Sequence, residues 1–335
     1  MTDHVRRGIL ATVGSTPLVE LERLSIDCDM RVFAKVEKFN PGGSIKDRTA
    51  VSMLLDRLYT GQLDPGRSVV VESSSGNLAI GLAQLCRYFG LRFVCVVDAR
   101  TTSHNVSVLR AYGAEVEVVT EPDPVTGELL AARLRRVEEL LDELPDAFWP
   151  NQYANPRNPK AHERTMREIA TALNDRVDYL FCPTGTTGTL QGCARYVRAH
   201  GLSTTIVGVD AVGSVLFDPD PPPVSRLVPG HGASVRPALL DPSAAHRVVH
   251  VDDLDCVVGC RRLVAREAIL AGGSSGAAVS ALHRLAPSLP PGSTCVLILP
   301  DGGDRYLDTV YSDQWVREHF GDVTHHWRDP AVARI

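Results

Sequence analysis

A lysine directly after a glycine-rich turn is the residue of this sequence best suited to covalent chemistry. Lys46 follows Pro41-Gly42-Gly43 and Ser44, and apolar residues four apart predict a helix over residues 45–58. We expect Ser44 to cap this helix, whose positive end favours the neutral, nucleophilic form of the lysine amine. Taken alone, the segment fits a surface lysine behind a loop equally well.

Three consecutive serines stand between a strand-like run and a helix-like run, in Ser73-Ser74-Ser75-Gly76-Asn77. Hydroxyls and backbone N–H groups at the start of a helix form an anion site, for which a substrate α-carboxylate is a suitable guest. Asn77 is placed to hydrogen-bond a phenolic oxygen on a cofactor ring. Ordinary N-capping would explain one serine, but not three followed by glycine and asparagine.

A second junction of strand and helix, Pro183-Thr184-Gly185-Thr186-Thr187-Gly188-Thr189, combines two glycines with several hydroxyls. This composition predicts a phosphate cradle made without any lysine. The Gly-Lys-Ser/Thr ending of a P-loop is absent, and so is the GxGxxG spacing of a dinucleotide site. Glycine–threonine loops are by themselves a weak signal.

A run of small residues, Ala271-Gly272-Gly273-Ser274-Ser275-Gly276-Ala277-Ala278, forms the fourth segment. Small side chains would let the end of a helix approach a flat ring, and Ser274 could then face a pyridine nitrogen as a neutral partner. Without the other segments, a glycine-rich turn followed by a packed alanine helix would be the favoured interpretation.

Short β-branched runs alternate with helix-like segments along the chain, which is typical of buried parallel strands joined by helices. The predicted strands cover residues 69–72, 93–97, 115–119, 179–182, 205–209 and 295–299, and further helices cover 77–89 and 129–144. The Pro- and Asn-rich stretch 145–160 suggests a crossing between two domains. We therefore predict an α/β fold with two open, doubly wound sheets.

Bulk composition limits the classes of protein to which the chain can belong. Its 335 residues suit two packed domains, and a net charge of −5 gives no support for a nucleic-acid or membrane partner. No apolar run approaches the ~20 residues that cross a bilayer, and the first seven residues do not resemble a signal peptide, so we expect a cytoplasmic protein. The eight cysteines contain no CxxC pair, and we expect neither a metal nor a disulfide.

Together these segments resemble the cysteine synthase / cystathionine β-synthase family of fold-type II pyridoxal-phosphate (PLP) enzymes. Gly14-Ser15-Thr16-Pro17-Leu18-Val19 and Asn151-Gln152-Tyr153-Ala154-Asn155-Pro156 extend the resemblance. It implies two open twisted α/β domains with the cofactor in the cleft between them. Residues 1–45 with 152–335 would form the larger, PLP-binding domain, and residues 46–151 a smaller, mobile domain for the substrate carboxylate. A homodimer is also implied.

The resemblance assigns roles to individual residues. It implies that Lys46 carries PLP through a covalent imine and that its freed amine acts as general base. It places Asn77 on the 3′ oxygen of the cofactor and Ser274 opposite the ring nitrogen. The implied phosphate ligands are Gly185, Thr186, Thr187, Gly188 and Thr189. The implied substrate-binding residues are Ser74, Ser75, Gly76, Gln152 and Tyr153.

Finer motifs, such as residues 229–234 and 299–313, resemble a branch of the family that joins O-phospho-L-serine to L-glutamate and releases phosphate. Its product leads to 2,3-diaminopropionate for siderophores or peptide antibiotics. The sequence departs from the cysteine synthase pattern at Thr187, where glycine is usual, and at His231, where an aliphatic residue is usual. These departures predict a loop shaped for an acceptor other than the sulfide of cysteine synthases.

Two anionic substrates need positive partners, for which Arg133, Arg236 and Arg305 are candidates. We expect Arg133 to bind the substrate phosphate, because the resemblance aligns it with an arginine of that branch, and arginine presents a bidentate donor pair. A solvated surface position is nevertheless the better explanation for any one of them taken alone.

Several other functions stay open at this point. The main alternative is a cysteine synthase that uses O-acetylserine or O-phosphoserine with sulfide. A serine or threonine dehydratase is less favoured, because the Asn-Gln-Tyr segment and Asp304-Arg305-Tyr306-Leu307 resemble the synthases. A non-catalytic protein with this fold would not need Lys46, and an NAD-dependent oxidoreductase lacks its fingerprint.

Overall fold

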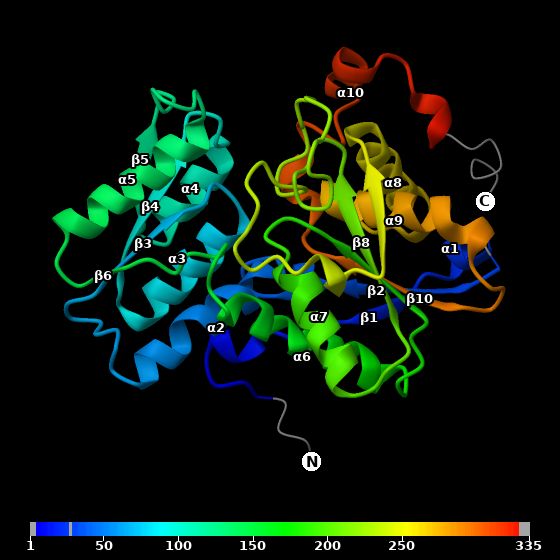
Figure 1. Ribbon diagram of the computed structural model, residues 1–335, viewed down its shortest axis with the longest axis horizontal. Helices are drawn as coiled ribbons and strands as arrows, with labels where there is room; N and C mark the ends of the chain where they lie inside the picture. Colours follow the sequence, from blue (N-terminus) through cyan, green and yellow to red (C-terminus); the bar gives the residue numbers. More distant parts are fainter. Residues whose placement is uncertain (1–4, 27–28, 328–335) are drawn as a thin grey trace. The chain divides into compact units, whose positions relative to one another are not determined.

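The computed structural model describes residues 5–26 and 29–327, and the chain divides into two compact units (Figure 1). Unit 1 comprises Met1–Val13 and Asn40–Ala161, and unit 2 comprises Gly14–Phe39 and His162–Ile335. Both contain a parallel sheet with helices, which confirms the predicted α/β class. The roles assigned to the domains 1–45 with 152–335 and 46–151 stay a prediction. Residues 1–4 of the expected leaderless N-terminus and Cys28 lie outside the described residues.

Unit 1 contains a four-stranded sheet in the order β5-β4-β3-β6, with every neighbouring pair parallel. Its elements are α2 (Lys46–Tyr59), β3 (Val69–Ser73), α3 (Asn77–Phe89), β4 (Arg92–Asp98), α4 (Ser103–Ala111), β5 (Glu115–Val119), α5 (Leu129–Glu143) and β6 (Ala147–Phe148). The strands and helices predicted for this region are confirmed to within a residue at each end. The short β6 was not predicted.

Alternating side chains explain how this sheet is covered on both faces. One set of strand residues packs against α5, and the other packs against α2, α3 and α4. The two sets face opposite ways because successive side chains of a strand point to opposite faces of the sheet. The first set is Val69, Val71, Val94 and Val96, which meet Val137 and Leu140. The second set is Val70, Phe93, Cys95 and Val97, which meet Leu54, Leu78, Leu82 and Leu109.

Unit 2 contains a six-stranded sheet in the order β1-β2-β10-β7-β8-β9, in which only the edge strand β1 is antiparallel to its neighbour. Its elements are β1 (Leu18–Glu20), α1 (Glu22–Ile26), β2 (Arg31–Val36), β7 (Tyr179–Pro183), α7 (Gly188–Ala199), β8 (Thr205–Ala211), β9 (Arg247–Val251), α8 (Asp253–Glu267), α9 (Gly273–Leu285), β10 (Thr294–Leu299) and α10 (Asp313–Phe320). Helix α6 (Arg157–Ala172) runs from unit 1 into unit 2. The predicted strands at β7, β8 and β10 are confirmed, whereas β1, β2 and β9 were missed.

Short 3₁₀ helices complete the described chain. They are η1 (Ile9–Thr12), η2 (Glu37–Phe39), η3 (Pro242–Ala244), η4 (Ala286–Ser288), η5 (Gly303–Tyr306) and η6 (Thr324–His326). Every helix in the described part of the chain is too short or too polar to cross a membrane.

Helices α8 and α9 touch at two facing glycines. A Cβ on Gly276 would lie 2.0 Å from the carbonyl oxygen of Cys256, and one on Gly259 would lie 2.0 Å from that of Gly276. The two backbones are therefore in direct contact. Helix packing accounts for Gly276, which supports the simpler interpretation of its motif as a turn followed by a packed helix.

We expect Gly276→Ala to lower the free energy of unfolding by more than about 3 kcal/mol, because the new methyl group would overlap backbone atoms. Urea denaturation of the apoprotein measures this loss. The matched control is Ala278→Gly in the same helix, which should cost about 1–2 kcal/mol. Equal losses in the two variants would show that close helix contact is not what requires Gly276.

Candidate active site

The two predicted cofactor segments of unit 2 lie at the same edge of its sheet. The glycine–threonine loop, residues 184–189, follows β7 and leads into α7. The start of α9 is tied to the end of β10, since Gly272 N donates to Asp301 O at 3.2 Å. Because β7 and β10 are parallel neighbours, their carboxyl ends bring both segments to one edge.

The glycine–threonine loop has the features of an anion site. Thr187 is the N-cap of α7 and adopts a left-handed backbone, with φ of 64°, which is costly for a β-branched residue. Its hydroxyl is buried and has no hydrogen-bond partner among the described residues. The Thr184 hydroxyl donates to Asp210 Oδ1 at 2.8 Å and anchors the loop to β8. An unpaired hydroxyl beside a helix N-terminus fits a phosphate group.

The first turn of α9 carries two serine hydroxyls. Ser274, predicted to face the pyridine nitrogen, is partly exposed. Ser275 is 0% exposed, and its hydroxyl has no hydrogen-bond partner within the described residues. A buried hydroxyl without a partner is a second candidate to face the ring. Sequence reasoning missed Ser275 because a Ser-Ser pair does not reveal which side chain points inward.

Residues 226–234, the 226–234 loop, connect the two segments. Gly232 N donates to Thr184 O at 2.8 Å, which joins this loop to the glycine–threonine loop. At α9, a Cβ on Gly273 would lie 2.3 Å from Val228 Cγ1. The absence of a side chain at Gly273 therefore lets the 226–234 loop approach the start of α9.

In unit 1, the serine-rich segment lies at the carboxyl end of β3. Helix α3 begins at Asn77 after the N-cap Gly76, which has no side chain to occupy the first backbone N–H groups. Ser74 Oγ accepts a hydrogen bond from Ala79 N at 3.3 Å, so capping explains this serine. Asn105 Nδ2 donates to Ser75 O at 2.9 Å and fixes the loop from α4. The segment thus forms a glycine-led helix start that suits a carboxylate.

Lys46 is the first residue of α2, and its side chain is partly exposed. Its backbone N–H donates to Ser44 Oγ at 3.2 Å, so Ser44 supports the helix start although the N-cap is Ile45. Helices α2 and α3 pack closely, since a Cβ on Gly81 would lie 3.2 Å from Ala50 Cβ. Unit 1 therefore holds the beginnings of α2 and α3, which carry the predicted site residues Lys46 and Asn77.

A buried carboxyl group that sequence reasoning did not single out lies beside the serine-rich segment. Glu72 Oε1 accepts hydrogen bonds from Ser73 N and Trp149 Nε1, both at 3.0 Å. Burial raises the pKa of Glu72 to about 7, although these donors and the backbone N–H groups of Asn151 and Gln152 oppose the shift. Glu72 therefore links β3 to the segment that contains Gln152. A lone glutamate in an apolar strand was the available signal.

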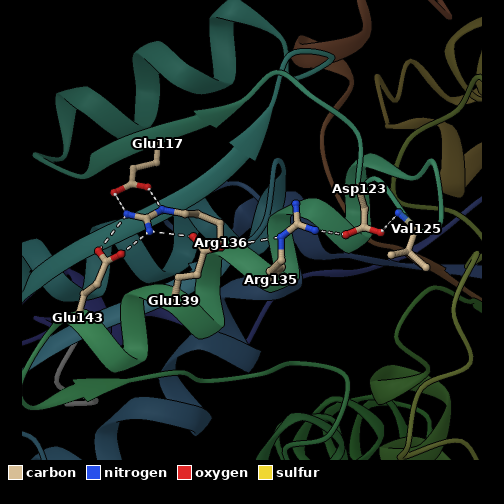
Figure 2. A network of polar contacts seen from close by, with 7 residues as sticks. All are labelled: Glu117, Asp123, Val125, Arg135, Arg136, Glu139 and Glu143. Carbon is tan, nitrogen blue, oxygen red and sulfur yellow. Dashed lines mark hydrogen bonds and ion pairs between the residues drawn. The ribbon is translucent and has the colours of Figure 1, made fainter.

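The arginines of α5 have different surroundings, as Figure 2 shows for the outer pair. Arg135 and Arg136 form ion pairs with the carboxylates Asp123, Glu117, Glu139 and Glu143. Arg133 instead has a side chain 12% exposed, with Nε 3.2 Å from Asp98 Oδ2 at the end of β4. Its Nη1 is buried without a hydrogen-bond partner among the described residues. Of these three arginines, Arg133 is the one placed at the carboxyl edge of the sheet.

The predicted residues thus fall into two groups. Unit 1 contains Lys46, Ser74, Ser75, Gly76, Asn77, Arg133, Gln152 and Tyr153, and unit 2 contains Gly185, Thr186, Thr187, Gly188, Thr189 and Ser274. Gln152 is buried, and its backbone carbonyl oxygen accepts a hydrogen bond from Asn158 Nδ2 at 2.8 Å. Tyr153 is partly exposed. The individual roles of these residues stay predictions.

Comparison with known proteins gives consistent results. Residues 9–301 match the family described as pyridoxal-phosphate dependent enzyme. The chain is 47% identical over 313 residues to an N-(2-amino-2-carboxyethyl)-L-glutamate synthase of Ralstonia nicotianae, covering 93% of this chain and 91% of that protein. A crystal structure of O-ureido-L-serine synthase matches with a TM-score of 0.83 and 32% identity, covering 92% of this chain and 98% of that one. An O-acetylserine dependent cystathionine beta-synthase from Helicobacter pylori matches with a TM-score of 0.84 and 28% identity, covering 92% and 100% of the two chains.

We expect Glu72→Gln to flatten the pH dependence of stability. Because the pKa of Glu72 is raised to about 7, the folded state keeps a proton that the unfolded chain loses at lower pH. The stability from this proton is complete below the unfolded pKa and is lost as pH rises through about 7. Between about pH 5 and pH 8, the wild type should lose up to about 3 kcal/mol more than E72Q. Urea denaturation across this range measures the difference.

The matched control is Glu115→Gln in strand β5 of the same sheet. Arg92 lowers the pKa of Glu115, so this carboxylate has the opposite shift and its removal should not flatten the profile. Parallel profiles for the wild type and E72Q would mean that the buried carboxyl does not titrate in this range.

Proposed function

Because this chain belongs to the family of pyridoxal-phosphate-dependent enzymes, we propose that it catalyses β-replacement on O-phospho-L-serine with the amine of L-glutamate. The products are then N-(2-amino-2-carboxyethyl)-L-glutamate and phosphate. The observation that carries the proposal is the 47% identity, over 93% of the chain, to a synthase named for this product. The helix start of the serine-rich segment supports it, since the α-carboxylate of phosphoserine is an anion.

Lys46 is the residue proposed to bind the cofactor covalently, at the start of α2. When bound, PLP supplies an electron sink for the charge that develops at the substrate α-carbon. The freed Lys46 amine then takes the α-proton and returns it after the acceptor has added. Ser274 or Ser275 gives the ring nitrogen a neutral partner, which limits electron storage and favours loss of the β-substituent over transamination.

Substrate orientation is the proposed task of the serine-rich segment. Ser75, Gly76 and the α3 N-terminus hold the α-carboxylate, together with Gln152 and Tyr153. Glu72 supports this arrangement because its hydrogen bond from Trp149 holds the chain before Gln152 against β3. Asn77 contacts the 3′ oxygen of the cofactor. The glycine–threonine loop binds the cofactor phosphate.

Arg133 is the proposed partner of the phosphate on the substrate. Its unpaired Nη1 supports this role, because a charge-assisted bond to phosphate would satisfy a buried donor. Asp98 keeps the guanidinium in place before the substrate binds.

The proposal extends to the localisation, the oligomeric state and the pathway of the enzyme. We propose a cytoplasmic homodimer whose product leads to 2,3-diaminopropionate for a siderophore or a peptide antibiotic. The alternative acceptor is sulfide, as in a cysteine synthase, with O-acetylserine or O-phosphoserine as donor. Because the chain is similar to an O-acetylserine dependent enzyme, the assay also measures turnover with sulfide as the acceptor.

We expect purified holoenzyme given phosphoserine and glutamate to form a product whose mass equals that of glutamate plus the serine-derived aminocarboxyethyl group. Mass spectrometry and phosphate release measure the reaction, and sulfide replaces glutamate in a parallel assay. Lys46→Ala should lose the visible cofactor absorbance and the product, because it removes the covalent link and the base. Faster turnover with sulfide would instead identify a cysteine synthase.

We expect Arg133→Ala to raise the KM for phosphoserine roughly 10- to 100-fold, because a charge-assisted hydrogen bond contributes about 1.5–3 kcal/mol. Steady-state kinetics with varied phosphoserine measures this change. Arg135→Ala is the matched control on the same helix and should leave KM unchanged, because that arginine is already paired with Asp123 and Glu139.

Asp98→Asn separates binding from structure. If Arg133 only stabilises unit 1 through its ion pair, D98N and R133A should lower the melting temperature equally, with little effect on KM. If Arg133 binds phosphate, R133A should raise KM far more than D98N. An unchanged KM in R133A would contradict the assignment.

A further inference from the structure

His231 is a buried polar side chain to which the proposed function gives no role. It is 4% exposed, and neither ring nitrogen has a hydrogen-bond partner among the described residues. Its neighbours Gly230 and Gly232 both have left-handed backbones, with φ of 78° and 70°. Leaving a buried donor or acceptor unpaired is unfavourable, so a ligand that pairs with it is a physical expectation.

The backbone around His231 is fixed against the glycine–threonine loop. Gly232 N donates to Thr184 O at 2.8 Å, and a Cβ on Gly185 would lie only 3.2 Å from Gly230 O. The 226–234 loop is also held from within, because Arg226 Nη1 donates to Ala233 O at 3.0 Å. His231 is therefore held beside the start of the loop proposed to bind phosphate.

The imidazole is neutral near pH 7. Burial lowers the pKa of His231 to about 4, and the positive charge of Arg226 acts in the same direction, whereas the backbone carbonyl of Thr184 opposes the shift. A neutral imidazole has one N–H donor and one acceptor nitrogen. It therefore donates a hydrogen bond to an anion without adding a buried charge.

Thr187 shows the same combination of features in the adjoining loop. Its hydroxyl is buried without a partner in the described part of the chain, and its left-handed backbone would suit glycine better. Thr187 and His231 are also the two positions that depart from the cysteine synthase pattern. Two polar departures in touching loops, both without partners, indicate a common guest.

We infer that His231 donates a hydrogen bond, together with the Thr187 hydroxyl, to the phosphate of the cofactor in the glycine–threonine loop. His231 is thus a positioning residue for PLP. This inference rests on the proposed phosphate role of residues 185–189 and not on the identity of the acceptor.

The test compares His231→Leu and His231→Gln with the wild type. PLP titration of each apoprotein gives the dissociation constant, and ³¹P NMR of each holoenzyme reports the surroundings of the phosphate. We expect H231L to bind PLP at least tenfold more weakly and to shift the ³¹P resonance. H231Q should recover part of both, because its amide also donates. His200→Leu, at an exposed histidine after α7, should change neither.

The melting temperature of the apoprotein separates this role from a structural one. H231L should leave it unchanged or higher, because an unsatisfied polar group has been removed. An unchanged PLP affinity and ³¹P resonance in H231L would overturn the inference, whatever the melting temperature. If Thr187→Gly shifts the ³¹P resonance while H231L does not, the loop binds phosphate without His231. If neither variant shifts it, the proposed role of the loop fails as well.

Discussion

Parallel pairing of β7 with β10, and of β3 with β4, brings the carboxyl ends of these strands to one edge of each sheet. Each strand then needs a helix to return the chain, so the helix N-termini gather at that same edge. Backbone N–H groups without helical partners are concentrated there, and they attract anions. The cofactor phosphate and the substrate carboxylate of a PLP enzyme are the anions that such edges suit.

The sequence predicts helices and strands well where hydrophobic periodicity agrees with the glycines that bound the element. Helix α3 begins at Asn77 and ends at Phe89 as predicted, because Gly76 and Gly90 bound an apolar run. Strand β9 was missed, since the exposed Arg247 and the partly exposed His250 leave it without a long apolar run. Periodicity alone does not predict which distant segments share a unit, and the expectation that residues 1–45 join 152–335 came from the family resemblance. Residues 14–39 belong with a unit that resumes at His162, and such pairing depends on contacts far apart in sequence.

For the site residues, the sequence predicts the segments but not which individual side chain of each segment is buried. Motif order pointed to the glycine–threonine loop and to the serine pair of α9, but burial decides which hydroxyl lacks a partner. That hydroxyl is Ser275 in α9 and Thr187 in the loop. A glycine in a motif can likewise have a packing role, because close contact with α8 requires Gly276 whether or not a ligand binds nearby. A motif therefore contains residues required for packing as well as residues required for chemistry, and three-dimensional contacts are needed to distinguish the two.

The charges of the two units point to different kinds of anion binding. Around the glycine–threonine loop, the donors are backbone N–H groups, a threonine hydroxyl and a neutral histidine, so no buried cation has to be desolvated before phosphate binds. A cofactor that stays bound through many turnovers suits such a prearranged neutral cradle. Arg133 is already paired with Asp98, so a substrate phosphate must share or replace that carboxylate. This exchange offsets part of the attraction and keeps the binding of phosphate reversible, which a substrate with a phosphate leaving group requires.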